Sequence, residues 1–336
     1  MKVKANIISY LVVMLFCCTT SCKKEKSNLK VVENQNSITY KTFEKDSIWY
    51  KVYRKFNNKI LRPTVINVFQ SVSDSTKLSM ADIGLFNMLI QNYDCSNLKV
   101  SDFQTKYPFA KYEFVKGNFD KLVEKELFKR EKDFYQLTVN GNDVLNLLKR
   151  NYQAIDDTKV DNFSLDILNR VSQHALSNKF TGINKSLKNC QKASLRFDDS
   201  KNKFVQLLTV MNHLVALRND QSHYRYSFLE TKPYSFKEEL SYPIIELLAG
   251  YYNSKSFNPN NYLNRPTWGY NKKETNEYVD YLKKKDLIDK SDSLYTLSKK
   301  AEIAEKQAIK KSEEKFYEPW LFLTNDDYKK FKKTLQ

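Results

Sequence analysis

The strongest constraint on the fold of this chain is an internal repeat. Residues 119–138 align without a gap on residues 279–298, at an offset of 160, with six identities in twenty positions. The identical residues are Asp120, Leu122, Lys125, Leu127, Tyr135 and Leu137, which return as Asp280, Leu282, Lys285, Leu287, Tyr295 and Leu297. A repeat with this period means that the chain builds one supersecondary unit twice.

The residues around each copy predict a helix, a two-stranded hairpin and a second helix. In the first copy a helix runs from about Lys111 to Glu126, a charged turn at residues 129–133 separates two short strands, and Thr138 begins the next helix. The chain has six glycines and seven prolines in 336 residues, and 14% of its residues are aromatic. This composition favours a mainly helical protein with well-filled cores.

Helical periodicity extends on both sides of the first copy. Apolar residues predict one helix from about Asp46 to Asn57, a second from Ile60 to Val72, and a third that Ser79 caps, with Asp82 completing a capping box. Between the copies, residues 153–230 have the pattern of a helical bundle. Arg218 falls near the apolar stripe of its helix there, so it needs a carboxylate or carbonyl partner.

The repeated motif resembles the winged helix-turn-helix of MarR-like regulators. The matching residues in the first copy are Leu122, Leu127, Phe128, Arg130, Tyr135, Leu137, Thr138 and Gly141. Glu126 stands where that family has a turn glycine, and the second copy has Asp286 there and Ala301 in place of Gly141. The resemblance implies a mainly α fold with small β wings, in which tandem winged-helix units flank a helical bundle. We expect winged-helix-like domains at 45–152 and 231–336, with the bundle segment at 153–230.

The N-terminus has the features of a secretory signal. A basic start at Met1–Lys4 leads into an apolar stretch from Ala5 to Phe16, which is short for a membrane span. Ser21 and Cys22 follow, and this ending resembles the lipobox of bacterial lipoproteins, in which the sulfur of the cysteine is acylated and the signal is cut off before it. Thr19 stands where that motif usually has leucine, so Cys18 is a second candidate site, and an uncleaved signal anchor is the alternative. The resemblance implies a signal peptide at 1–21, lipidation of Cys22, a polar tether at 22–44, and a location in the bacterial cell envelope outside the cytoplasm.

Charge on the repeated units argues against nucleic acid as a partner. The chain carries a formal charge of +17, but its lysines are mixed with acidic residues along the whole sequence, which is typical of a solvated surface. The helix of the first copy has four lysines and four carboxylates, and that of the second has a net charge of +2. DNA affinity depends on neutralising phosphates, which such helices do poorly. The possible interaction surface comprises Lys116, Lys121, Lys125, Arg130, Lys132, Lys272, Lys273, Lys283 and Lys284.

Few residues are suited to metal or covalent chemistry. His174, His213 and His223 are the only histidines, and all fall in the predicted bundle, where three histidines could form a metal site. However, His213 is predicted opposite the apolar stripe of its helix, so surface or capping histidines are the preferred interpretation and no metal or cofactor is assigned. No nucleophile elbow, phosphate-binding loop or dinucleotide fingerprint occurs. Cys95 and Cys190 could form one disulfide, but the sequence does not place them together.

Three functions are compatible with these features. The preferred hypothesis is a membrane-anchored lipoprotein, held by acylated Cys22, that acts without catalysis as a protein-interaction or structural module for an unknown protein partner. The first alternative is a winged-helix DNA-binding regulator, which requires the body of the chain to be inside the cell. The second is a metal-dependent hydrolase built in the helical bundle.

Overall fold

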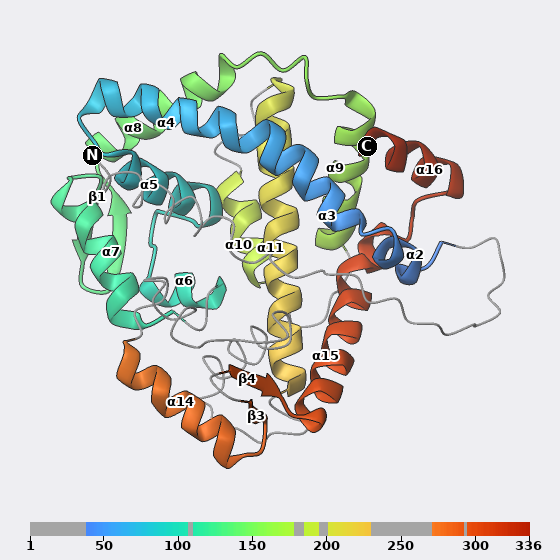
Figure 1. The fold of residues 1–336 in the computed structure, drawn as a ribbon. Coiled ribbons are helices and arrows are strands. Elements are labelled where there is room, and N and C mark those ends of the chain that lie inside the picture. Colours follow the sequence, from blue (N-terminus) through green and yellow to red (C-terminus); the bar gives the residue numbers. More distant parts are fainter. Residues whose placement is uncertain (1–37, 107–109, 178–184, 195–200, 230–270, 292–293) are drawn as a thin grey trace.

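A computed structural model describes residues 38–106, 110–177, 185–194, 201–229, 271–291 and 294–336 (Figure 1). The protein is mainly helical, with two small antiparallel sheets of two strands each. The signal peptide, Cys22 and most of the tether predicted at 22–44 lie outside the described residues. The last residues of that tether form helix α2 (Tyr40–Lys45), in which Phe43 is fully buried.

A long continuous helical segment follows α2 and contains an extended π-helix. It consists of α3 (Ile48–Val52), the π-helix η2 (Tyr53–Leu61) and α4 (Arg62–Thr76). The predicted break between residues 57 and 60 is therefore wrong. The buried side chains Val52, Phe56 and Leu61 recur every four to five residues, which matches the wider turn of a π-helix. This wider turn also accommodates Pro63, which has no N–H for an α-helical hydrogen bond.

The first repeated unit is preceded by two helices, α5 (Met80–Asn92) and α6 (Val100–Lys106). Helix α5 begins as predicted, because the Ser79 side chain accepts a hydrogen bond from the Asp82 backbone N–H at 3.1 Å. We call the elements that follow unit 1: α7 (Tyr112–Glu124), β1 (Phe128–Glu131), β2 (Phe134–Leu137) and α8 (Val139–Gln153).

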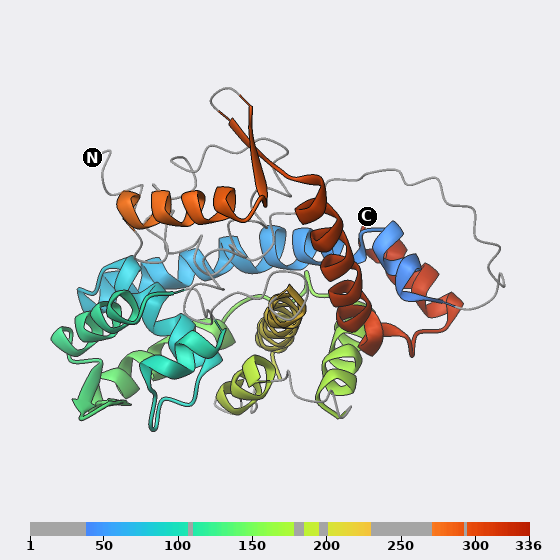
Figure 2. The same cartoon turned by 90° about the horizontal axis from the view of Figure 1, so that it is seen from below.

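Unit 2 repeats this succession at the same offset of 160 residues. It consists of α14 (Lys272–Lys284), β3 (Ile288–Ser291), β4 (Leu294–Leu297) and α15 (Lys299–Tyr317). The strand registers correspond, with Phe128 opposite Leu137 and Ile288 opposite Leu297. Each second helix has an equivalent cap, because Thr138 accepts from the Gly141 N–H and Ser298 from the Ala301 N–H. The repeat seen in the sequence is thus a structural repeat, and the β3–β4 hairpin of unit 2 projects from the body (Figure 2).

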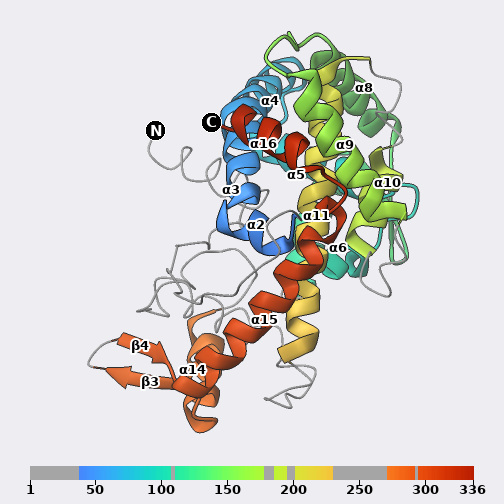
Figure 3. The ribbon, with the colours of Figure 1, turned by 90° about the vertical axis from the view of Figure 1, so that its right-hand side faces the viewer.

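The segment between the units contains three helices, α9 (Asn162–Ser177), α10 (Lys185–Ser194) and α11 (Lys203–Leu229). Helix α11 is central: it contacts α9, α10, α15 and η2, and it lies between α3 on one side and α10 on the other (Figure 3). Because neighbours surround it, α11 buries residues on every face along 204–221. The prediction of a helical region here is confirmed.

The two ends of the described chain are packed together. After α15 come the 3₁₀-helix η5 (Glu318–Trp320) and α16 (Asn325–Thr334). Phe43 of α2 stacks on Tyr317 at 5.5 Å between ring centroids and meets Tyr328 edge-on at 5.2 Å. Asp46 accepts hydrogen bonds from the Tyr328 hydroxyl and from Lys332. We call this contact between residues 40–49 and 316–332 the terminal clasp.

Candidate functional site

Asp120 is the centre of a polar network that fixes the hairpin of unit 1 to its first helix. It accepts hydrogen bonds from Lys116 at 2.7 Å and from the Tyr135 hydroxyl at 2.8 Å, and Arg130 lies 3.8 Å away. Burial tends to raise the pKa of Asp120, but the hydrogen bonds from Lys116 and Tyr135 outweigh it and lower the pKa. Burial and the bond to Asp120 raise the pKa of Tyr135. Two of the repeated identities, Asp120 and Tyr135, therefore have a structural role.

This network changes the interpretation of the predicted interaction surface of unit 1. Lys116 and Arg130 are both held by Asp120, whereas Lys121, Lys125 and Lys132 are exposed. Exposed cations and exposed carboxylates of α7 and the hairpin are equal in number. They are Lys121, Lys125, Lys129, Arg130 and Lys132 against Glu113, Glu124, Glu126, Glu131 and Asp133. The outer surface of unit 1 is therefore electrically balanced.

The first helix and hairpin of unit 2 have the same balance on the side chains that the structure describes. Of its predicted contact residues, Lys272, Lys273 and Lys284 are exposed, and Lys283 forms an ion pair with Asp280 at 2.9 Å. The exposed charges of α14 and its hairpin, through residue 289, are Lys272, Lys273, Lys284 and Lys285 against Glu277, Asp280, Asp286 and Asp289. Neither first helix with its hairpin presents a basic surface of the kind that binds a phosphate backbone. The second helix of unit 2 differs, because α15 exposes Lys299, Lys300, Lys306, Lys310, Lys311 and Lys315, while its carboxylates are partly or fully buried.

An ion pair joins the beginnings of the first helices of the two units. Lys111, the residue before α7, contacts the carboxylate of Glu274 in the first turn of α14. The hydrogen bond from Lys111 is the main cause of the lowered pKa of Glu274. Glu274 also completes a capping box with Asn271. The first helices of the two units therefore meet at their N-terminal ends (Figure 1).

The turn between the first helix and the hairpin keeps a left-handed backbone in both units. Glu126 has φ of 58° and Asp286 has φ of 54°, at the position where the MarR-like motif has glycine. The left-handed conformation favours glycine because other side chains crowd the following carbonyl. The departure from the family motif thus changes the side chain at this position while the backbone keeps a glycine-type conformation.

His213 is buried, so its prediction as a surface residue is wrong. Its Nδ1 lies 2.8 Å from the Ser172 hydroxyl of α9, and its Nε2 lies 3.2 Å from the Ser194 hydroxyl of α10. Burial lowers the pKa of His213 to about 4, so the ring is neutral at physiological pH. His174 instead stacks on Phe322 at 4.6 Å between ring centroids. The side chain of His223 lies outside the described part of α11.

Arg218, Cys95 and Cys190 are also buried or nearly so. Arg218 has the carboxylate partner that its position required, because Nη2 lies 2.5 Å from Oε1 of Glu313 on α15. Cys95 and Cys190 are both buried thiols and are not joined in a disulfide. Their Sγ atoms contact backbone carbonyls of one short stretch, that of Tyr93 at 3.5 Å and that of Gln91 at 3.6 Å.

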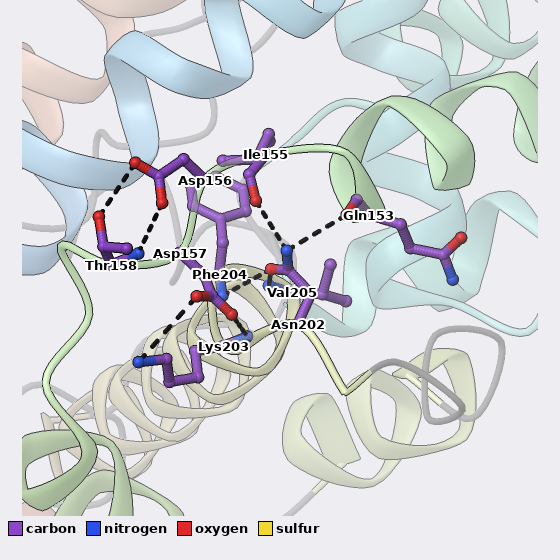
Figure 4. A network of polar contacts seen from close by, with 9 residues as sticks. All are labelled: Gln153, Ile155, Asp156, Asp157, Thr158, Asn202, Lys203, Phe204 and Val205. Carbon is purple, nitrogen blue, oxygen red and sulfur yellow. Dashed lines mark hydrogen bonds and ion pairs between the residues drawn. The ribbon is translucent and has the colours of Figure 1, made fainter.

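A polar network between α8 and α11 was not anticipated from the sequence (Figure 4). The Asn202 side chain accepts hydrogen bonds from the first N–H groups of α11 and donates to the Ile155 carbonyl at 2.8 Å. Asp157 accepts from the Lys203 backbone N–H at 2.7 Å. The Asp-Asp-Thr run at 156–158 and Asn202 before an apolar helix are local capping signals, but only the fold places them together. The network positions the central helix.

Within the described ranges, no three His, Cys, Asp or Glu side chains come together in a way that could hold a metal ion. Among the helices described, none is both long enough and apolar enough to cross a membrane. No protein-family model matches the chain, and neither a curated protein nor a solved structure matches it.

Proposed function

We propose that the chain is a lipid-anchored envelope protein whose two winged-helix-like units and helical bundle form a non-catalytic module for binding another protein. The N-terminal sequence supports the anchor: a basic start, a short apolar stretch and Cys22 after a small residue. The unit of helix, hairpin and helix occurs twice with corresponding bounds and caps, which supports the comparison with tandem winged helices.

The observation that carries the choice of a protein partner is the charge balance on the first helix and hairpin of both units. Five exposed cations face five exposed carboxylates in unit 1. Alternating charges of both signs suit recognition of a protein surface, where complementary pairs give specificity. They do not suit a uniformly anionic polymer, which gains its affinity from an excess of cations. Fold alone does not assign a function, so the assignment follows the surface chemistry.

Labelling with palmitate tests the anchor directly. The wild-type chain should incorporate the label, and Cys22→Ser should not, while Cys18→Ser serves as the matched control for the neighbouring cysteine. Protease added to intact cells, with the outer membrane permeabilised where one is present, should digest the wild-type body while a cytoplasmic marker survives. Full protection of the body together with an absence of label would overturn the proposal.

A DNA-binding regulator remains the alternative, because unit 2 exposes Lys272, Lys273 and Lys284 on one helix. Its signature would be binding to duplex DNA at about 50 mM salt that falls steeply toward about 200 mM. The protein-interaction proposal expects no such binding through α14. If duplex binding were lost in Lys272→Gln/Lys273→Gln and retained in Lys121→Gln/Lys125→Gln, the alternative would replace it.

A further inference from the structure

The segment from Ser47 to Ser73 contains no acidic residue and five basic ones. They are Lys51, Arg54, Lys55, Lys59 and Arg62. Residues 167–197 form a second acid-free run, with six basic residues, and the run at 47–73 is the one that lies nearer to the N-terminus. Three cations of the run at 47–73, Arg54, Lys55 and Lys59, lie on the π-helix η2, and π-helical turns occur frequently at functional sites. A charge run and an unusual backbone thus fall on the same element.

Three of these cations form an exposed surface, which we call the basic face: Lys51, Arg54 and Lys59. Arg54 and Lys59 are exposed and Lys51 is partly exposed, and no ion pair within 4 Å is recorded for the three among the described residues. Lys55 is excluded because it contacts the Thr334 carbonyl and lies 3.9 Å from Asp161. The basic face therefore keeps its charge available to an outside partner.

The opposite side of the same helix is already used by the protein. Ile48, Val52 and Phe56 are fully buried in the core. Among the large aromatic and apolar side chains of residues 48–56, only Tyr50 is exposed, at 53%, so a partner of the basic face must be held mainly by charge. Contacts of this kind are with surfaces of high negative charge density, and they weaken as salt screens them.

We propose that the basic face docks on the anionic headgroups of the bilayer that carries the lipid anchor. This inference rests on the proposed anchor at Cys22. The described chain begins sixteen residues later, at Ile38, and a chain of that length reaches at most about 55 Å. Helix α2 then leads directly into the basic face, so this face belongs to the part of the body nearest in sequence to the proposed anchor. Docking there would orient the body and turn the side that carries α10 away from the bilayer (Figure 3).

Vesicle binding by chain that lacks the acyl group tests the docking separately from the anchor. The full mature chain, from residue 22 with Cys22→Ser, would be sedimented with phosphatidylcholine vesicles that contain or lack phosphatidylglycerol. Each cation near an anionic surface raises the partition coefficient roughly fivefold. Arg54→Gln/Lys59→Gln should therefore lower binding to the anionic vesicles about 25-fold.

The matched control is Lys188→Gln/Lys192→Gln, which removes the same charge from exposed positions of α10, across α11 from the basic face. It should lower binding less than about threefold, since these positions would lie beyond a Debye length of roughly 10 Å from the bilayer. Equal losses in both variants, or equal binding to neutral and anionic vesicles, would overturn the docking. The docking would also be overturned if Arg54→Gln/Lys59→Gln lowered binding to duplex DNA more than it lowered binding to the anionic vesicles. Failure of palmitate labelling would instead overturn the proposed lipid anchor at Cys22 and leave these vesicle results unchanged.

Discussion

Adding one methyl group to Gly141 tests how tightly unit 1 closes. A Cβ atom at Gly141 would lie 2.2 Å from the Leu127 carbonyl oxygen and 3.1 Å from a methyl carbon of Leu137. The Leu127 carbonyl cannot move away without weakening the hydrogen bond that it accepts from the Thr138 backbone N–H at 3.2 Å. Separating the two atoms to van der Waals contact requires a backbone shift of about 1 Å, and overpacking of this kind costs roughly 1–3 kcal/mol.

The expected net effect includes the helix propensity of alanine. Alanine is favoured over glycine in a helix by about 0.5–1 kcal/mol, so Gly141→Ala should destabilise the protein by about 1–2 kcal/mol. Gly117 of α7 is the matched control, since a Cβ there would meet no atom within 4 Å. Gly117→Ala should stabilise the protein by about 0.5–1 kcal/mol through the same propensity term.

Urea unfolding followed by circular dichroism measures both changes. The midpoint should fall for Gly141→Ala and rise for Gly117→Ala, with unchanged slopes. Unit 2 provides an internal comparison, because Ala301 occupies the equivalent position and its N–H is 3.3 Å from the capping hydroxyl, against 2.9 Å for Gly141. If Gly141→Ala were neutral or stabilising, the close approach of Leu127 to α8 would be refuted.

Three further predictions follow from the described contacts. Asp286→Gly should stabilise the protein by about 1 kcal/mol in urea unfolding, because the backbone there is left-handed at φ of 54°. Lys285→Gly, at φ of −95°, should instead destabilise the protein. Equal effects of the two substitutions on the unfolding midpoint would contradict the prediction. His213 has its pKa lowered to about 4, so between pH 7 and 5 the unfolded chain takes up a proton that the folded one does not, and stability should fall by about 2 kcal/mol. His213→Gln should remove this part of the pH dependence, and identical pH slopes would count against it. Glu313→Gln should cost about 2–4 kcal/mol in urea because Arg218 would lose its buried carboxylate partner, and Glu313→Leu with Arg218→Met should recover most of that loss.

Local sequence signals predicted the repeated units well. The offset of 160 residues predicted two copies with equivalent strands, and the hydroxyls of Ser79 and Thr138 cap helices where their positions indicated. A cap and a hairpin depend on residues within a few positions of one another, so the sequence contains their determinants. The need of Arg218 for a partner was also predictable from its helical face, although the identity of Glu313 was not.

The incorrect predictions have a common physical origin in tertiary packing. Helix α11 buries side chains on all faces, so the position of His213 opposite one apolar stripe did not imply exposure. In η2 the buried residues repeat with a π-helical spacing, so an assumed period of 3.6 residues per turn divides this segment into two helices. The basic face was present in the sequence as an acid-free run, but its availability depended on which lysines other elements engage.

The terminal clasp determines how the body would respond to a mechanical load. A pull applied at Ile38 would act first on α2, where Phe43 and Asp46 are held by Tyr317, Tyr328 and Lys332. Tension would therefore pass into the last helices of the chain and leave α7, α14 and their hairpins outside the load path. Loss of the C-terminal helix would remove Tyr328 and Lys332 from α2 and leave the ring contacts of Phe43 with Tyr317 and Trp320, so the N-terminal end should yield at a lower force.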